Sequence, residues 1–160
     1  MKICLYTMHR WETLGEMAEI TFANKEEYVH RHGYALHFEP WSGRGWPGFA
    51  RLPVFNYLVR CGYYDWVFWL GTDCLITNLN TKLESLADPN YGIVMATDSN
   101  ELQMDSLLVQ RHHGGLELLE SVSRLEGNYQ RPNYEQTALE VLRKTSKYSN
   151  VIKIIPQRLM

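Results

Sequence analysis

The sequence predicts a single α/β domain in which helices cover both faces of a central β-sheet. Its 160 residues, of which 45% are hydrophobic, are enough for one core of ordinary size. Short unbroken apolar runs alternate along the chain with longer amphipathic segments, and such runs are typical of strands that are covered on both faces. This alternation favours a sheet of the kind whose ligands bind at the carboxyl ends of the strands.

In the first half of the chain, turn residues separate the expected elements. Gly33 ends an amphipathic helix, because glycine readily adopts the left-handed conformation that closes a helix. Pro53 falls in the first turn of a second helix, where proline is tolerated. The segment 40–48 is rich in glycine, proline and tryptophan, so it is either a mobile lid or a packed surface loop. We expect strands over 2–8, 34–38 and 65–70 and helices over 12–32 and 49–61.

In the second half, strands again alternate with amphipathic segments. Leu118, Leu119, Val122 and Leu125 recur on one face of a helix over 113–125. Asn133 suits the N-cap of a helix over 134–144. We expect strands over 91–97, 106–110 and 151–155, a short extended piece over 75–78, and a short helix over 83–86.

Charge and cysteine content exclude several classes of protein. The 16 Lys and Arg against 18 Asp and Glu give a net charge of −2, which offers no basic surface for nucleic acid. No apolar run approaches the roughly 18 residues of a membrane span. Cys4, Cys61 and Cys74 are widely spaced without a Cys-x-x-Cys pair, so a structural zinc site is not expected. Two of the three lie in apolar runs, which favours reduced, buried thiols and hence a cytoplasmic protein.

Three polar residues follow directly after expected strands. These are Thr7, Asp73 and Asp98, and the carboxyl ends of the strands are where an α/β sheet places its ligand. A carboxylate such as Asp73 can hold a hard divalent cation that also contacts phosphate oxygens. It can equally cap the next turn, and local spacing leaves both interpretations open.

The segment 65–78 resembles the part of GT-A-fold glycosyltransferases that carries their Asp-x-Asp motif. The resemblance is strongest to the galactosyl- and mannosyltransferase family related to the fungal Golgi α-galactosyl and α-mannosyl enzymes. It implies one GT-A-like domain over residues 1–160, with a Rossmann-type sheet and helices on both faces. Further matching pieces follow in the family's order at residues 24–28, 32–34, 46–51, 98, 105–111, 134–139 and 155–158.

Two departures separate this chain from the family's pattern. Gly71 stands where the first Asp of Asp-x-Asp is expected, which leaves Asp73 to bind the metal alone. The sequence ends at Met160, before the His that supplies another metal ligand and before the family's C-terminal closing segment. The resemblance still implies Mn²⁺ or Mg²⁺ as cofactor, at reduced affinity.

The resemblance also implies where the donor binds. Asp73 would hold the metal and, with Thr72, contact the nucleotide of the donor. Thr7 would lie near its base or ribose. Arg51 would offer a planar fork to a phosphate, although a surface arginine at the start of a helix has the same local sequence.

Other residues are assigned to the transfer step and the acceptor. Asp98, Glu135 and Gln136 would act on the sugar, and Asp105 and Trp46 would lie on the acceptor side. A glutamine is a poor nucleophile, which favours attack on the same face, assisted by the leaving phosphate. On local sequence alone, Asp98 equally suits a strand-end turn and Glu135 the first turn of a helix.

The sequence thus predicts a soluble hexosyltransferase of bacterial, phage or viral type. It would move a hexose from a nucleoside diphosphate sugar to a glycan, lipid or protein acceptor, with retention, in the cytoplasm of a cell or of a viral host. Gly71 and the absent His favour one alternative, a non-catalytic nucleotide-sugar or glycan binding domain. A nucleotidyltransferase is less consistent, because residues 7–11 contain no glycine to form a phosphate loop. A purely structural assembly protein would not need polar residues at the strand ends.

Overall fold

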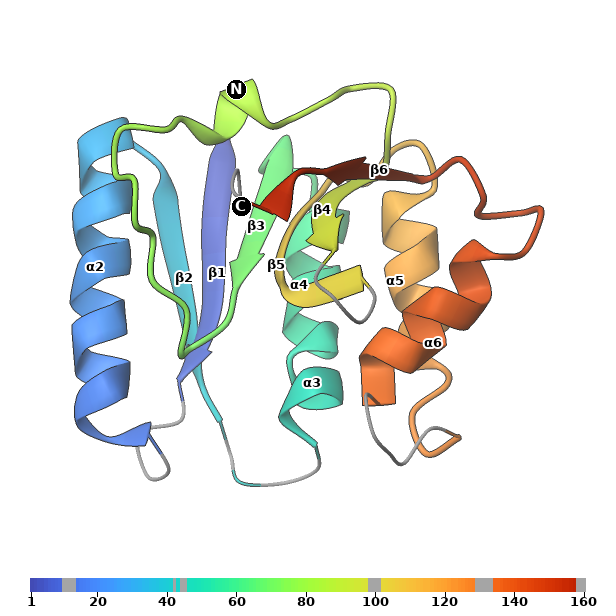
Figure 1. Ribbon diagram of the computed structural model, residues 1–160, viewed down its shortest axis with the longest axis horizontal. Coiled ribbons are helices and arrows are strands. Elements are labelled where there is room, and N and C mark those ends of the chain that lie inside the picture. The colour runs from blue at the N-terminus through green and yellow to red at the C-terminus, as the bar shows by residue number, and fades with distance from the viewer. Residues whose placement is uncertain (10–13, 42, 44–45, 98–101, 129–133, 158–160) are drawn as a thin grey trace.

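The protein is built around one six-stranded sheet (Figure 1). The computed structural model describes residues 1–9, 14–41, 43, 46–97, 102–128 and 134–157. The strands are β1 (Ile3–His9), β2 (Ala35–Pro40), β3 (Trp66–Leu70), β4 (Ile93–Thr97), β5 (Leu102–Val109) and β6 (Ile152–Ile155). Their order is β2-β1-β3-β5-β4-β6, and β5 alone among these six runs antiparallel to its neighbours.

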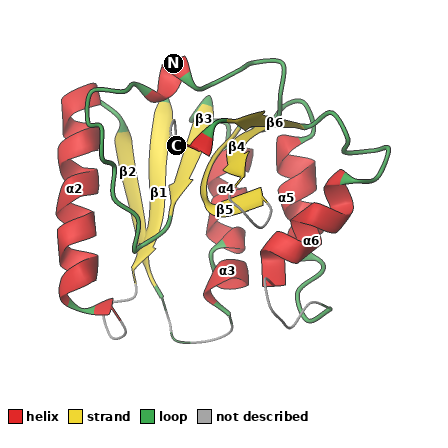
Figure 2. Cartoon of the chain, in the orientation of Figure 1, coloured by secondary structure: helices red, strands yellow, loops and turns green. Residues whose placement is uncertain are grey.

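Helices cover both faces of the sheet, as the sequence predicts (Figure 2). The helices are α2 (Glu16–His32), α3 (Pro47–Ala50), α4 (Leu52–Arg60), α5 (Gly115–Ser123) and α6 (Tyr134–Arg143), with a 3₁₀ turn η1 (Leu83–Ser85). In β3, Val67 and Trp69 join the apolar cluster of α4, α5 and α6, whereas Phe68 and Leu70 join the cluster of α2 and the loop after β3. The strand is buried on both sides, which explains its unbroken apolar sequence.

Several boundaries follow from single residues. Gly33 ends α2 in the left-handed conformation, at φ 70°, and its N–H donates to the Val29 carbonyl. The helix expected over 49–61 is divided at Arg51 into α3 and α4. Pro53 has no N–H to offer to the preceding turn, which accounts for the break there. Asn133, expected as an N-cap, lies outside the described residues.

Strand β5 differs most from the expectation. It begins at Leu102 rather than at 106, so its polar residues Gln103 and Asp105 belong to the sheet. Because β5 is antiparallel to β3, its first residues lie at the edge where β3 ends, and Leu70 pairs with Ser106.

The cysteines are all free. Cys4 is buried, Cys74 half-buried and Cys61 exposed, so the expectation of burial holds fully for Cys4 alone. Of the helices that the structure describes, none is both long and apolar enough to cross a membrane.

Candidate active site

A cavity of about 140 Å³ lies at the carboxyl ends of β1 and β3. Its described lining comes from β1, β3, β5, α3, α6 and the loop after β3. Segments far apart in the sequence therefore meet at the sheet edge where the strand-end residues were expected to gather. The predicted site residues that line it are Trp46, Arg51, Thr72, Asp73, Asp105 and Glu135.

The other predicted site residues lie elsewhere. Thr7 is fully buried in β1, and its hydroxyl has no hydrogen-bond partner among the described residues. Gln136 is half-buried beside Glu135 but is not part of the described cavity lining. Asp98 lies outside the described residues. The cavity thus brings together the predicted metal and acceptor-side residues and three of the four donor residues, but only one residue of the expected catalytic set.

Arg51 lies at the centre of the cavity wall as a buried cation. Its Nη2 donates to Glu135 Oε1 at 3.2 Å, and its Nη1 lies 3.9 Å from Asp105 Oδ1. The guanidinium also lies over the Trp69 ring, 4.4 Å from the ring centroid. Burial lowers the pKa of Arg51, and the carboxylates of Glu135 and Asp105 oppose that effect. Arg51 is only 2% exposed, so the surface-arginine interpretation is wrong.

Gly48 leaves the room that the Glu135 carboxylate occupies. A β-carbon at position 48 would lie 2.0 Å from Glu135 Oε2, closer than any real contact. Two residues before Gly48, the Trp46 ring stacks on the Tyr134 ring, with the centroids 4.0 Å apart and the planes 20° from parallel. Helices α3 and α6 therefore meet beside the cavity through a glycine–carboxylate contact and an aromatic stack.

The loop that carries Asp73 is fixed to neighbouring elements on both sides. The Thr72 hydroxyl donates to the Met8 carbonyl of β1, and the Thr21 hydroxyl of α2 donates to the Thr72 carbonyl. Asp73 itself is exposed and faces the cavity. The backbone on which this carboxylate is carried is thereby held in one position.

Lys25 of α2 is a fully buried lysine beneath the same loop. Its Nζ donates to the Cys74 carbonyl at 3.0 Å and the Thr72 carbonyl at 3.3 Å. Burial lowers the pKa of Lys25 to about 8, although the charges of Cys74 and Asp73 oppose the shift. The two carbonyls that flank Asp73 thus share one buried ammonium group.

Helix α2 continues to bind this loop further along. Asn24 donates from Nδ2 to the Ile76 carbonyl at 3.1 Å and accepts from the Ile76 N–H at 2.8 Å. The Tyr28 hydroxyl donates to the Thr81 carbonyl at 2.6 Å. The extended segment after Asp73 therefore lies along one polar stripe of α2. The Asn24 side chain pairs with both backbone groups of Ile76, as a neighbouring strand would.

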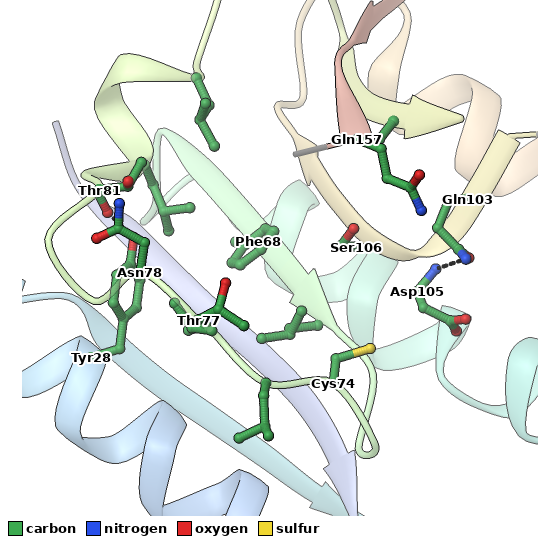
Figure 3. A pocket seen from close by; sticks show the side chains of 16 residues that line it. Tyr28, Phe68, Cys74, Thr77, Asn78, Thr81, Gln103, Asp105, Ser106 and Gln157 are labelled. Carbon is green, nitrogen blue, oxygen red and sulfur yellow. Dashed lines mark hydrogen bonds between the residues drawn. The ribbon is translucent and has the colours of Figure 1, made fainter. Parts of the chain in front are cut away.

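A second cavity, of about 410 Å³, lies on the other face of β3 and β5 (Figure 3). Its floor is apolar, with Phe68 beneath it, and Gln103, Ser106 and Gln157 stand on one side. Asp105 lines both cavities, so the two meet at the start of β5. The described lining of this larger cavity includes no lysine or arginine, which suits an uncharged ligand with hydroxyl groups better than a diphosphate.

The charge of the smaller cavity is consistent with a divalent cation. Its described lining holds the carboxylates of Asp73, Asp105 and Glu135 and the guanidinium of Arg51, a formal charge of −2. Within the described parts of the chain, no three His, Cys, Asp or Glu side chains form a complete metal site. Mg²⁺ and similar ions, however, commonly use one or two carboxylates together with substrate phosphates. These residues therefore fit a cation that arrives with a diphosphate.

Comparison with known proteins identifies the fold. No protein-family model matches the chain, and no curated protein sequence does. Among solved structures, it is similar to a glycosyltransferase involved in the glycosylation of the major capsid of PBCV-1. That structure is 19% identical, with a TM-score of 0.80, over 98% of this chain and 83% of the other.

Two further structures share the architecture. The mannosyltransferase PcManGT from Pyrobaculum calidifontis, in complex with GDP-Man and Mn²⁺, is 15% identical, with a TM-score of 0.57, over 98% of this chain and 55% of its own. A mutant Drosophila β1,4-galactosyltransferase 7 with manganese, UDP-Gal and xylobiose is 13% identical, with a TM-score of 0.57, over 100% of this chain and 66% of its own. The chain therefore has the GT-A-like α/β fold that the sequence predicts. Membership of the galactosyl- and mannosyltransferase family stays a prediction.

Two residues that shape this site, Lys25 and Gly48, are not among the predicted site residues. Lys25 occurs four residues after Thr21 and three before Tyr28, which puts all three on one face of α2. A lysine on the face of a helix that also carries buried residues is a signal that could have been used. Gly48 carried no such signal, because its partner Glu135 is remote in the sequence.

Proposed function

We propose that the protein is a glycosyltransferase that moves a hexose from a nucleoside diphosphate sugar to a hydroxyl group of an acceptor. The observation that supports this most directly is the cavity at the carboxyl edge of a GT-A-like sheet, where Asp73 lines the same space as Arg51 and its two ion-pair partners, Asp105 and Glu135. Such a sheet binds its ligand at that edge. The glycosyltransferases of similar fold, two of which hold Mn²⁺ with a nucleotide sugar, support the same proposal.

In this proposal Asp73 would hold Mn²⁺ or Mg²⁺ at the diphosphate. A bound cation of this kind stabilises the charge that develops on a leaving diphosphate. The loop holds the backbone of Asp73 in place before the donor arrives, since Lys25 and Thr21 already bind the adjacent carbonyls. Less reorganisation is then required when the donor binds.

Arg51 and Glu135 would bind the sugar. Their hydrogen bond orients the Glu135 carboxylate, whose remaining lone pairs can accept from sugar hydroxyls. Glu135 engages Nη2, so the phosphate contact expected of Arg51 would come from its other guanidinium nitrogens. The resemblance implies retention, and because no described residue is assigned as a nucleophile, we propose attack on the same face assisted by the leaving phosphate.

The acceptor would approach through the larger cavity. Asp105 lines both cavities, and the other hydrogen-bonding side chains of the larger one are uncharged, which suits a glycan or the hydroxyl-bearing part of a lipid or protein. Trp46, half exposed beside the smaller cavity, would contact the sugar or the acceptor from the opposite side.

The test is titration calorimetry with UDP and GDP, with and without Mn²⁺, followed by hydrolysis assays with UDP-Glc, UDP-Gal and GDP-Man. We expect metal-dependent binding and slow donor hydrolysis, both lost in Asp73→Ala while circular dichroism shows an intact fold. Asp65→Ala is the matched control, because Asp65 lies before the amino end of β3, away from the cavity. Binding that needs no metal and gives no hydrolysis would instead favour a nucleotide-sugar binding domain, the alternative that Gly71 favours.

A further inference from the structure

Gly71, directly after β3, and Asp105 of the adjacent strand β5 are direct neighbours. The Gly71 N–H donates to the Asp105 carbonyl at 2.8 Å. A β-carbon built on Gly71 would lie 3.5 Å from the β-carbon of Asp105 and 3.2 Å from Asp73 Oδ1. A side chain at position 71 would therefore start beside that of Asp105 and reach the same space next to Asp73.

We propose that Asp105 supplies the second carboxylate of the cation site, in place of the carboxylate that position 71 lacks. The inference rests on the proposed function and adds to it a ligand that comes from β5 rather than from the loop after β3. Asp73 and Asp105 would each give oxygen ligands, and the donor phosphates and water would complete the coordination. A divalent cation of the Mg²⁺ type is commonly bound by one or two carboxylates in this way.

Glu135, the other carboxylate of the cavity, is less suited to this role. Its side chain is 11% exposed, is bound to Arg51 at 3.2 Å and lies against Gly48. The Asp105 side chain is 56% exposed, and its 3.9 Å separation from Arg51 is too long for a hydrogen bond. Asp105 is therefore the more accessible of the two carboxylates to a cation in the cavity.

The same cavity wall contains buried donors that point to an anionic ligand next to the cation. Arg51 Nε and Trp69 Nε1 have no hydrogen-bond partner within the described part of the chain, although their side chains are 2% and 3% exposed. Buried donors of this kind are normally satisfied by a ligand or by water. A phosphate or sugar oxygen would satisfy them, while the cation balances the surplus of carboxylates.

The experiment measures Mn²⁺ binding directly, by electron paramagnetic resonance of free Mn²⁺ and by calorimetry, with and without UDP or GDP. We expect Asp105→Asn and Asp105→Ser each to weaken Mn²⁺ binding by about 10- to 100-fold, the loss caused when even an outer-shell partner is removed. Asp65→Asn, the same exchange at the far end of β3, should leave it unchanged.

The decisive variant moves the carboxylate from position 105 of β5 to position 71, after β3. Gly71→Asp combined with Asp105→Asn should restore Mn²⁺ affinity to within a few-fold of the unmodified protein, because both positions face the same space. Unchanged affinity in both Asp105 variants, with affinity lost in Asp73→Asn, would overturn the role of Asp105 and leave the proposed function standing. Absence of any nucleotide-dependent Mn²⁺ binding by the unmodified protein would instead overturn the proposed function itself.

Discussion

The buried Lys25 should make the free energy of unfolding depend on pH. Burial moves its pKa from 10.5 in the free side chain to about 8 in the folded protein. Between these two values the unfolded chain holds the proton and the folded chain has released it. Unfolding then takes up a proton, so the free energy of unfolding rises with pH over this interval. From about pH 7 to about pH 9.5 the gain is about 2 kcal/mol.

The variant that tests this is Lys25→Met, which keeps an unbranched side chain of nearly the same length and removes the ammonium group. The assay is urea unfolding followed by circular dichroism at a series of pH values. We expect the difference in unfolding free energy, unmodified protein minus variant, to grow by about 2 kcal/mol over that pH range. Tyrosines with raised pKa values are common to both proteins and cancel in the difference.

Lys82→Met on the same loop is the control, because Lys82 is exposed and exposed lysines keep their hydration on folding. A difference between unmodified protein and Lys25→Met that stays constant from pH 7 to 9.5 would contradict the lowered pKa of Lys25. It would mean that water or a counter-charge reaches the Lys25 ammonium and that the group is not desolvated beneath the Asp73 loop.

Other predictions concern the cavity and the loop. Gly48→Ala should weaken binding of the nucleotide sugar at least about tenfold in calorimetry, because the new methyl group displaces the Glu135 carboxylate from Arg51. A charged hydrogen bond of this kind contributes about 1.5–3 kcal/mol. Unchanged affinity would contradict a role of the Arg51–Glu135 pair in binding. Arg51→Lys should weaken binding similarly, because an ammonium cannot present a planar fork; if calorimetry shows full affinity, charge alone suffices. Tyr28→Phe should cost about 1 kcal/mol by removing the 2.6 Å bond to Thr81, and an unchanged urea midpoint would contradict this.

The sequence identifies the parts of the fold that local patterns determine. The apolar runs of β1 and β3 and the helix-ending Gly33 are visible because burial and backbone conformation act on consecutive residues. Asp73 was also predictable at the end of β3, since the sheet class fixes where strand ends lie. Its position in the lining of the cavity agrees with that expectation.

Other features depend on contacts between distant residues. The direction and full length of β5 were missed, because Gln103 and Asp105 interrupt its apolar run and only pairing with β3 and β4 reveals them. The burial of Arg51 was missed for a similar reason, since its partner Glu135 is 84 residues away in the sequence. Neither the pairing of β5 nor the Arg51–Glu135 contact produces a pattern in the local sequence.

The stack of Trp46 on Tyr134 makes the fluorescence of Trp46 a probe of ligand binding. Trp46, at the start of α3, lines the smaller cavity, and its stacking partner Tyr134 begins α6. A ligand that separates the rings, or seats itself between them and the solvent, changes the polarity around the indole and hence its emission. Occupancy can therefore be followed by intrinsic fluorescence without a label, with Trp46→Phe to assign the signal among the five tryptophans.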